Sequence, residues 1–137
     1  WGGEKFLAVL PTRHVNDAAE IALKVLVAVA GSPIKVNDSA FDVTISAGIC
    51  PLKFEFADRS ADWGDVLVLD DEALYFAKQN GRNRAYGIIT AAKVTSVEMR
   101  RGLRVNVEEG KVKLFEASYA SAVPNGKQFS GTLSNSR

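Results

Sequence analysis

Residues 71–84 read Asp-Glu-Ala-Leu-Tyr-Phe-Ala-Lys-Gln-Asn-Gly-Arg-Asn-Arg, and no other stretch of the chain has so distinctive a pattern. It predicts the end of a helix over residues 63–80, stopped by Gly81, a residue suited to a left-handed C-terminal cap. Lys78 lies in the last predicted turn and Arg82 just beyond the glycine, so both cations can reach one anionic group. The alternative is that they only complement the negative end of the helix dipole.

The first six residues, Trp-Gly-Gly-Glu-Lys-Phe, form a second stretch with a chemical pattern. Gly2 and Gly3 permit positive φ angles and a close approach of the backbone to a ligand, so their amides can face a phosphate. Glu4 offers a hard carboxylate oxygen to Mg²⁺. The alternative is that the glycine pair only makes an ordinary hairpin turn.

The composition indicates one soluble domain with balanced charge. The chain has 137 residues, 47% of them hydrophobic, and its 17 basic side chains nearly balance 16 acidic ones for a net charge of +1. This balance argues against recruitment of nucleic acid or an anionic membrane by a global field. No apolar stretch approaches the roughly 18 residues of a membrane span, and the single Cys50 fits a reducing compartment. We therefore expect a cytoplasmic chain, whose longer parent is free to be anchored upstream.

A helix is predicted over residues 15–30, with Asp17 as its cap and Gly31 at its end. Lys24 is its only charge after the first turn, so the helix is expected to be deeply buried or covered by another chain. Strands are predicted from short apolar runs and from alternating patterns. They cover residues 6–10, a hairpin of 34–36 with 41–47 that has one buried face, and residues 84–89.

The signals weaken after residue 89. Residues 93–101 predict a short helix stopped by Gly102, and residues 103–107 with 111–115 alternate around a turn, as in a hairpin. Beyond Ala117 the sequence is rich in Ser, Ala, Gly and Asn and has little to bury, so it is expected to be partly disordered. We therefore divide the chain into a body at residues 1–89, an accessory helix and hairpin at 90–117, and a flexible tail at 118–137.

The glycine turn followed by an acid and a phenylalanine, an Ile-Ser-Ala-Gly strand, and the motif at residues 71–84 occur in the order found in one known family. They resemble the carboxy-terminal part of the GGDEF domain, the diguanylate cyclase family, from residue 1 to about residue 88. The resemblance implies an α+β fold with a ferredoxin-like, polymerase-palm core. It also implies that two GTP molecules, one bound by each of two facing domains, are condensed into cyclic di-GMP.

The resemblance assigns roles to individual residues. Gly2 and Gly3 match glycines at a hairpin tip beside the nucleotide, and Lys78 and Arg82 match a pair that grips its terminal phosphates. Glu4 matches the catalytic acid that coordinates Mg²⁺ or Mn²⁺ and helps to deprotonate the attacking 3′-hydroxyl. The resemblance also matches Asp71, for which we expect a structural role.

Two departures put activity in doubt. Lys5 stands where the family has a second acid, and an ammonium there is expected to repel Mg²⁺ by about 1–4 kcal/mol. Alternatively, Lys5 points away from the metal and touches phosphate or solvent. The second departure is the apparent absence of the family's amino-terminal half, which implies a fragment that is inactive alone and that lacks an upstream regulatory site.

We expect exposed apolar surface to be covered in a homo-oligomer to which the two apolar helices contribute. Light scattering that showed a monodisperse monomer at micromolar concentration would exclude this. Two function classes remain open: part of a diguanylate cyclase, or a degenerate domain that binds a nucleotide or a protein partner and regulates.

Overall fold

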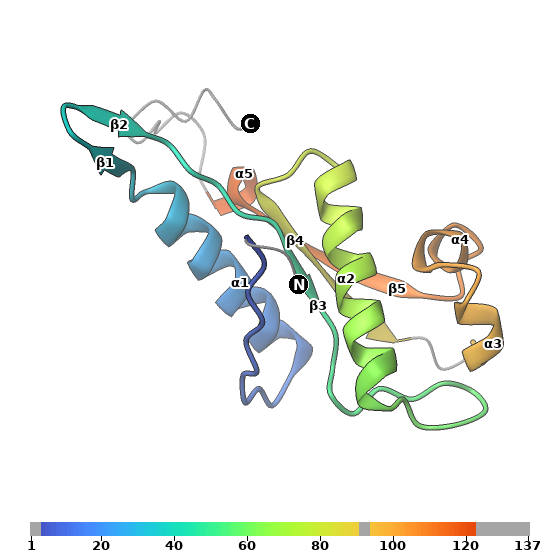
Figure 1. Cartoon of the computed structure of the whole chain (residues 1–137). Coiled ribbons are helices and arrows are strands. Elements are labelled where there is room, and N and C mark those ends of the chain that lie inside the picture. Colours follow the sequence, from blue (N-terminus) through green and yellow to red (C-terminus); the bar gives the residue numbers. More distant parts are fainter. Residues whose placement is uncertain (1–3, 91–93, 123–137) are drawn as a thin grey trace.

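The computed structural model describes residues 4–90 and 94–122, and these form two sheets and five helices (Figure 1). The first sheet is a small hairpin, and the second has the strand order β3-β4-β5. Helices and strands are mixed along the chain, so the fold is α+β, consistent with part of a palm-like domain. Predicted sites at Gly2 and Gly3 lie outside the described residues.

Helix α1 covers Val15–Ala30, as predicted. Its first turn is held by Asp17, whose Oδ2 accepts hydrogen bonds from the backbone nitrogens of Arg13, at 3.1 Å, and His14, at 3.0 Å. The prediction of Asp17 as the cap was therefore wrong by three positions, because His14 is the capping residue and Asp17 reaches back to it. The helix ends at Gly31.

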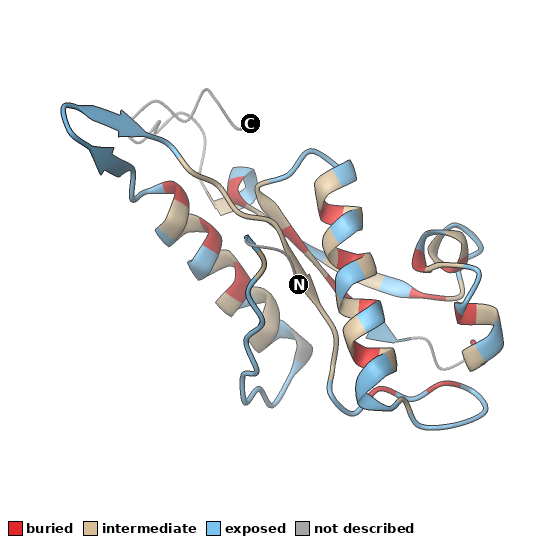
Figure 2. Cartoon of the chain, viewed as in Figure 1, coloured by how far each residue is buried: buried red, intermediate tan, exposed pale blue. Residues whose placement is uncertain are grey.

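The predicted hairpin forms from β1 (Ile34–Val36) and β2 (Ser39–Phe41), but its expected burial was wrong. All residues of both strands are exposed, and in Figure 2 the hairpin projects away from the body of the molecule. The turn is tight, with Asn37 at φ 53°, a conformation that Asn tolerates better than most residues. The second strand stops at Phe41, so the alternating residues after it do not continue the ladder.

Helix α2 covers Trp63–Gln79 and begins with a capping box. The side chain of Asp62 accepts from Asp65 N at 2.9 Å, and Asp65 Oδ2 accepts from Asp62 N at 2.9 Å. This reciprocal pair satisfies two donors that the first turn leaves without intrahelical partners. The prediction of residues 63–80 was accurate to one residue.

The second sheet consists of β3 (Ala47–Ile49), β4 (Arg84–Thr90) and β5 (Lys113–Ser118). β3 runs parallel to β4, and β5 runs antiparallel to β4. Helices α1 and α2 cover opposite faces of this sheet (Figure 1). Successive residues of a strand point to opposite faces, and accordingly Ala85 packs with α1 while Ile88 packs with α2.

The chain after β4 differs from the prediction. Helix α3 covers Ser96–Met99, within the predicted helix, but residues 103–107 are not a strand: Leu103–Glu108 is helix α4. The expected second strand is β5, which pairs with β4 rather than with residues 103–107. The alternating pattern suggested a strand, but the buried residues are Leu103 and Asn106. They lie three positions apart, and this spacing is typical of a helix. A last short helix, α5, covers Tyr119–Ala122.

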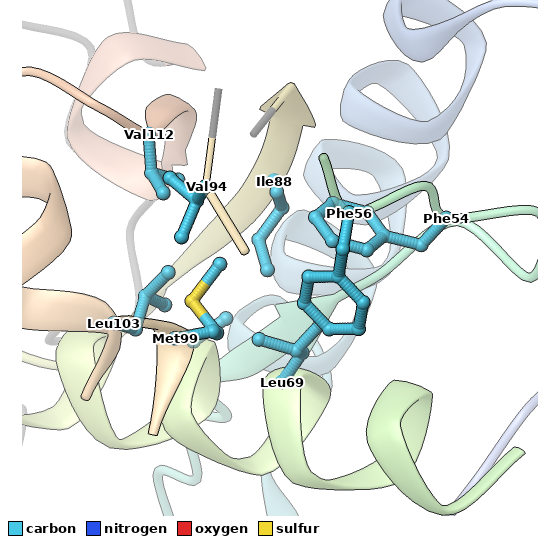
Figure 3. Packing of buried hydrophobic residues seen from close by; sticks show 9 residues of the cluster. Phe54, Phe56, Leu69, Ile88, Val94, Met99, Leu103 and Val112 are labelled. Carbon is cyan, nitrogen blue, oxygen red and sulfur yellow. The ribbon is translucent and has the colours of Figure 1, made fainter. Parts of the chain in front are cut away.

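The larger hydrophobic core lies between α2, β4 and the segment that follows β4. Leu69 of α2 and Ile88 of β4 meet Met99 and Leu103 from α3 and α4 in Figure 3. Helix α4 is also tied to α2, because Leu103 N donates a hydrogen bond of 2.6 Å to Glu72 Oε2. Residues beyond 89 thus pack into the same core as the residues before it.

The predicted strand at residues 6–10 does not form. These residues adopt no regular structure and are exposed, Phe6 to 94%. A strand exists only when a neighbour pairs with its backbone, and none of the named strands in the described part of the chain pairs with residues 6–10. The segment instead runs beside α1 and the start of β3 (Figure 1).

Candidate functional site

A wide cleft of about 1120 Å³ is lined by the amino-terminal segment, α1, β3 and α2. Its volume exceeds the roughly 300–1,000 Å³ of typical small-molecule sites, so a nucleotide has room in it. The charged residues of the candidate site that line this cleft are Glu4, Lys5, Asp70, Asp71, Lys78 and Arg82. Four of them are residues predicted from the sequence as a site, and the fold brings these four to one cleft.

The end of α2 explains how Lys78 and Arg82 come together. Arg82 N donates a hydrogen bond of 3.1 Å to Ala77 O, the link that closes a Schellman motif at a helix C-terminus. Gly81 has φ 110°, which turns the chain back over the last helical turn. Lys78 in that turn and Arg82 beyond it therefore lie at the same end of α2.

The loop after α2 is held in a strained form. Arg82 has φ 59° and Asn83 has φ 48°, values that are uncommon for residues with a side chain. Arg84 stabilises the turn: its Nε donates to Arg82 O at 3.1 Å, and its Nη1 donates to Glu116 Oε1 on β5 at 2.8 Å. Such strain persists only where surrounding contacts fix it, so β5 helps to position Arg82.

No carboxylate forms an ion pair with Lys78 or Arg82 among residues 4–90 and 94–122. Lys78 is partly buried and Arg82 is exposed. Neither charge is therefore neutralised by a carboxylate in the described part of the chain, and both are available to an anion in the cleft.

Lys5 has a partner in the structure that neither expectation named. Its Nζ donates to Asp71 Oδ1 at 2.7 Å, and the two side chains are 32% and 51% exposed. Lys5 thus contacts a carboxylate on α2. This ion pair attaches the turn that contains Glu4 to the middle of α2.

Two titratable groups close to the ion pair between Lys5 and Asp71, namely Asp70 and Cys50, were not predicted from the sequence to belong to the site. Burial raises the pKa of Asp70 to about 6, and the negative charge of Asp71 adds to the effect, while a backbone hydrogen bond from Cys50 acts against it. Burial and the charge of Asp70 raise the pKa of the Cys50 thiol to about 12. The one signal for Asp70 was its position between Leu69 and Ala73 on an otherwise apolar helix face.

Asp70→Asn is expected to stabilise the protein at neutral pH. A carboxyl whose pKa is higher in the folded state than in the unfolded chain destabilises the fold once it ionises, fully so above pH 6. Two pKa units correspond to about 3 kcal/mol, but partial exposure to solvent reduces the expected gain to about 1–2 kcal/mol. Urea unfolding at about pH 7.5 should show this gain, and at about pH 3, where the carboxyl is largely protonated in both states, the gain should nearly vanish. An equal gain at both pH values would contradict the explanation.

Glu4 is the described residue of the cleft that would hold a metal ion. No group of three or more metal-ligating side chains occurs in the part of the chain that the structure describes. Mg²⁺ in nucleotide sites is commonly held by one or two carboxylates together with substrate phosphates. The exposed carboxylate of Glu4 lies in a cleft with Lys78 and Arg82, which have no carboxylate partner among the described residues, and it fits that smaller role.

The comparison with protein families decides the classification. The model described as "Diguanylate cyclase, GGDEF domain" matches residues 1–84. The chain belongs to this GGDEF family. The match contains the Glu4 turn, β3, α2, Lys78 and Arg82, and it ends as β4 begins. Members of the family bind GTP as substrate, generally use a divalent metal ion and are often oligomeric.

Several curated proteins are similar to this GGDEF chain. The uncharacterized protein YhcK of Bacillus subtilis is 36% identical over 84 residues, which cover 61% of this chain and 22% of that protein. The response regulator PleD of Caulobacter vibrioides is 35% identical over 89 residues, 64% of this chain and 19% of PleD. Diguanylate cyclase A of Treponema denticola is 31% identical over 84 residues, 61% of this chain and 22% of that protein.

These matches span about a fifth of the length of the relatives. No solved structure matches the chain significantly. Among the described residues of this GGDEF chain, no helix is both long enough and apolar enough to span a membrane.

Proposed function

We propose that this chain is the phosphate-binding part of a diguanylate cyclase, which joins two GTP molecules into cyclic di-GMP with release of pyrophosphate. The observation that supports this most strongly is that Lys78 and Arg82 lie at the same end of α2, without a carboxylate partner among the described residues, in the cleft that Glu4 lines. Two cations at one end of α2 and a carboxylate that lines the same cleft suit a triphosphate.

In this proposal each residue of the chain has a distinct role. Lys78 and Arg82 donate charge-assisted hydrogen bonds to the terminal phosphates and hold the nucleotide in one orientation. Glu4 holds the metal ion and accepts the proton of the attacking 3′-hydroxyl, and Gly2 and Gly3 keep that turn free of side chains. When bound, Mg²⁺ or Mn²⁺ supplies charge neutralisation of the phosphates.

A single copy of the chain is proposed to bind GTP without turning it over. The reaction needs a second GTP, which in this proposal is presented by another copy of the chain. The exposed apolar side chains Val25 on α1 and Val68 on α2 suit a contact between copies. GTP as the substrate is consistent with the proposed cytoplasmic location of this part of the protein.

A second candidate is a regulatory domain that holds a nucleotide without catalysis. It is favoured by one observation, namely that Lys5 occupies the position after Glu4 and uses a carboxylate of α2 as its partner. Replacing Lys5 with Glu in a longer version of the protein separates the two candidates. A large gain in cyclic di-GMP would show that Lys5 was the defect of a cyclase.

The binding role of the two cations is tested with the 137-residue chain, GTP and Mg²⁺ in a calorimeter. Lys78→Ala and Arg82→Ala should each weaken GTP binding about tenfold to hundredfold, because each removes a hydrogen bond to a charged phosphate. Lys35→Ala, which removes an exposed lysine from the hairpin, serves as the matched control and should leave affinity unchanged. Equal affinity in all four proteins would contradict the proposed site, and mass spectrometry of the same mixtures detects any cyclic di-GMP.

A further inference from the structure

The ion pair between Lys5 and Asp71 joins two parts of the chain that lie 66 residues apart in the sequence. It is a single short contact of 2.7 Å between a partly buried ammonium and a carboxylate that is half exposed. Lys5 is the residue next to Glu4, and Asp71 lies on the face of α2 that lines the cleft. The contact therefore connects the turn that bears the candidate metal ligand to the helix that bears the candidate phosphate ligand.

The position of Asp71 along α2 sets the spacing of the site. Lys78 follows Asp71 by seven residues, and at 1.5 Å per residue the two lie about 10.5 Å apart along the helix axis. By binding Lys5, Asp71 holds the Glu4 turn about two helical turns from Lys78. Among the described residues, 6–10 follow this turn, are exposed and pair with no named strand, and the ion pair is a contact that ties the turn to α2.

The charge of Lys5 gives the contact a second consequence. An ammonium one residue from Glu4 competes with a metal cation for the same carboxylate and repels that cation. Once Asp71 accepts its hydrogen bond, the ammonium is drawn toward α2 and its charge is largely compensated. A lysine at position 5 is then compatible with a metal at Glu4 only while Asp71 holds it.

We propose that Asp71 is a positioning residue that acts through Lys5: it holds Lys5 against α2 and so keeps the Glu4 carboxylate free for a metal–nucleotide complex. The part that concerns metal and nucleotide rests on the function proposed above. The part that concerns Lys5 and Asp71 rests on their ion pair alone. Two measurements separate these parts.

The first measurement is the Mg²⁺ concentration that gives half-maximal GTP binding. Asp71→Asn should raise it about tenfold, the usual scale for loss of a residue that orients a metal ligand. Lys5→Gln should leave it near the starting value, because it removes the competing charge as well as the anchor. In the double variant Lys5→Gln with Asp71→Asn, the Asp71 substitution should have little further effect, since its partner is gone.

The second measurement uses no nucleotide. Trypsin cleaves after lysine and needs the side chain free, so cleavage after Lys5 reports how firmly Asp71 holds it. Asp71→Asn should speed this cleavage about two- to fivefold, the range for loss of an exposed ion pair. Cleavage after Lys35 in the exposed hairpin and after Lys113 in β5 provides the control, because a general loss of stability would speed the cut in the strand as well.

The outcomes are distinct. The Asp71→Asn substitution is compared in the unmodified chain and in the Lys5→Gln variant. If it raises the required Mg²⁺ concentration by the same factor in both, Asp71 acts directly and the proposal is overturned. Unchanged cleavage after Lys5 would also overturn it. If the unmodified chain binds no GTP at any Mg²⁺ concentration, the proposed function fails, and the cleavage rates alone then decide whether Asp71 positions Lys5.

Discussion

Gly48→Ala is expected to lower the free energy of unfolding by about 3 kcal/mol, the upper part of the range for overpacking a core. A Cβ at this position would collide with the carbonyl oxygen of Asp70 and lie 2.5 Å from the nitrogen of Leu74. Both atoms belong to the backbone of α2, so no side-chain rotation relieves the contact. The helix or the strand must move instead, and β3 would separate from α2.

Urea unfolding of the variant, followed by circular dichroism, measures this loss. Gly110→Ala is the matched control, because Gly110 has φ 72° but no atom within 4 Å of an added Cβ. Alanine there should cost only the conformational strain, about 1–2 kcal/mol. If Gly48→Ala were no more destabilising than Gly110→Ala, the close packing of β3 on α2 would not be a determinant of the fold.

Gly48 also affects the site, although it contacts no ligand. The strand approaches α2 beside Asp70, one residue from Asp71, so a displaced helix would carry Asp71 and Lys78 away from the Glu4 turn. We therefore expect Gly48→Ala to weaken GTP binding, and to do so more strongly the further it displaces α2. The only sequence signal was a glycine inside a strand pattern, which often marks a close approach of another backbone.

Leu103→Ala is expected to lower the free energy of unfolding by about 2–5 kcal/mol, as for other leucines truncated in a core. Leu103 is 2% exposed and packs in the cluster that contains Leu69 of α2 and Ile88 of β4 (Figure 3). It lies beyond residue 84, where the match to the GGDEF family model ends. Leu103→Ala therefore tests whether the segment after β4 belongs to the same folding unit as the family's motif.

Thermal or urea unfolding of Leu103→Ala should show one cooperative transition at lower stability. Val97→Ala in neighbouring helix α3, where the side chain is 66% exposed, is the control and should change stability by less than about 0.5 kcal/mol. Two separate transitions, with the first one alone shifted by Leu103→Ala, would show that α3 and α4 fold independently of the rest.

The elements with strong local signals were predicted well. Helix α1 matches its predicted bounds and α2 differs by one residue, because helical periodicity and capping are properties of neighbouring residues. Strand β4 was one residue short in the prediction. The convergence of Lys78 and Arg82 was also foreseeable, since a glycine cap turns the chain over the last helical turn whatever the surroundings.

The elements that depend on distant partners were not predicted well. Residues 6–10 have the composition of a strand but no paired neighbour in the described chain, and Leu103–Glu108 alternates like a strand but forms a helix whose first nitrogen binds Glu72. Strand pairing and such capping contacts join residues far apart in sequence, and local patterns contain no information about them.

The amino-acid sequence alone was sufficient to identify the family, the two helices that frame the cleft and the residue types that suit a triphosphate, because these follow from local periodicity and from short motifs. The tertiary structure decided which charges meet. It placed Lys5 on Asp71, and it buried Asp70 next to Cys50 so that the pKa of Asp70 rises. Both results depend on the approach of β3 to α2 and on the path of the amino-terminal turn, which are set by packing between segments distant in the chain.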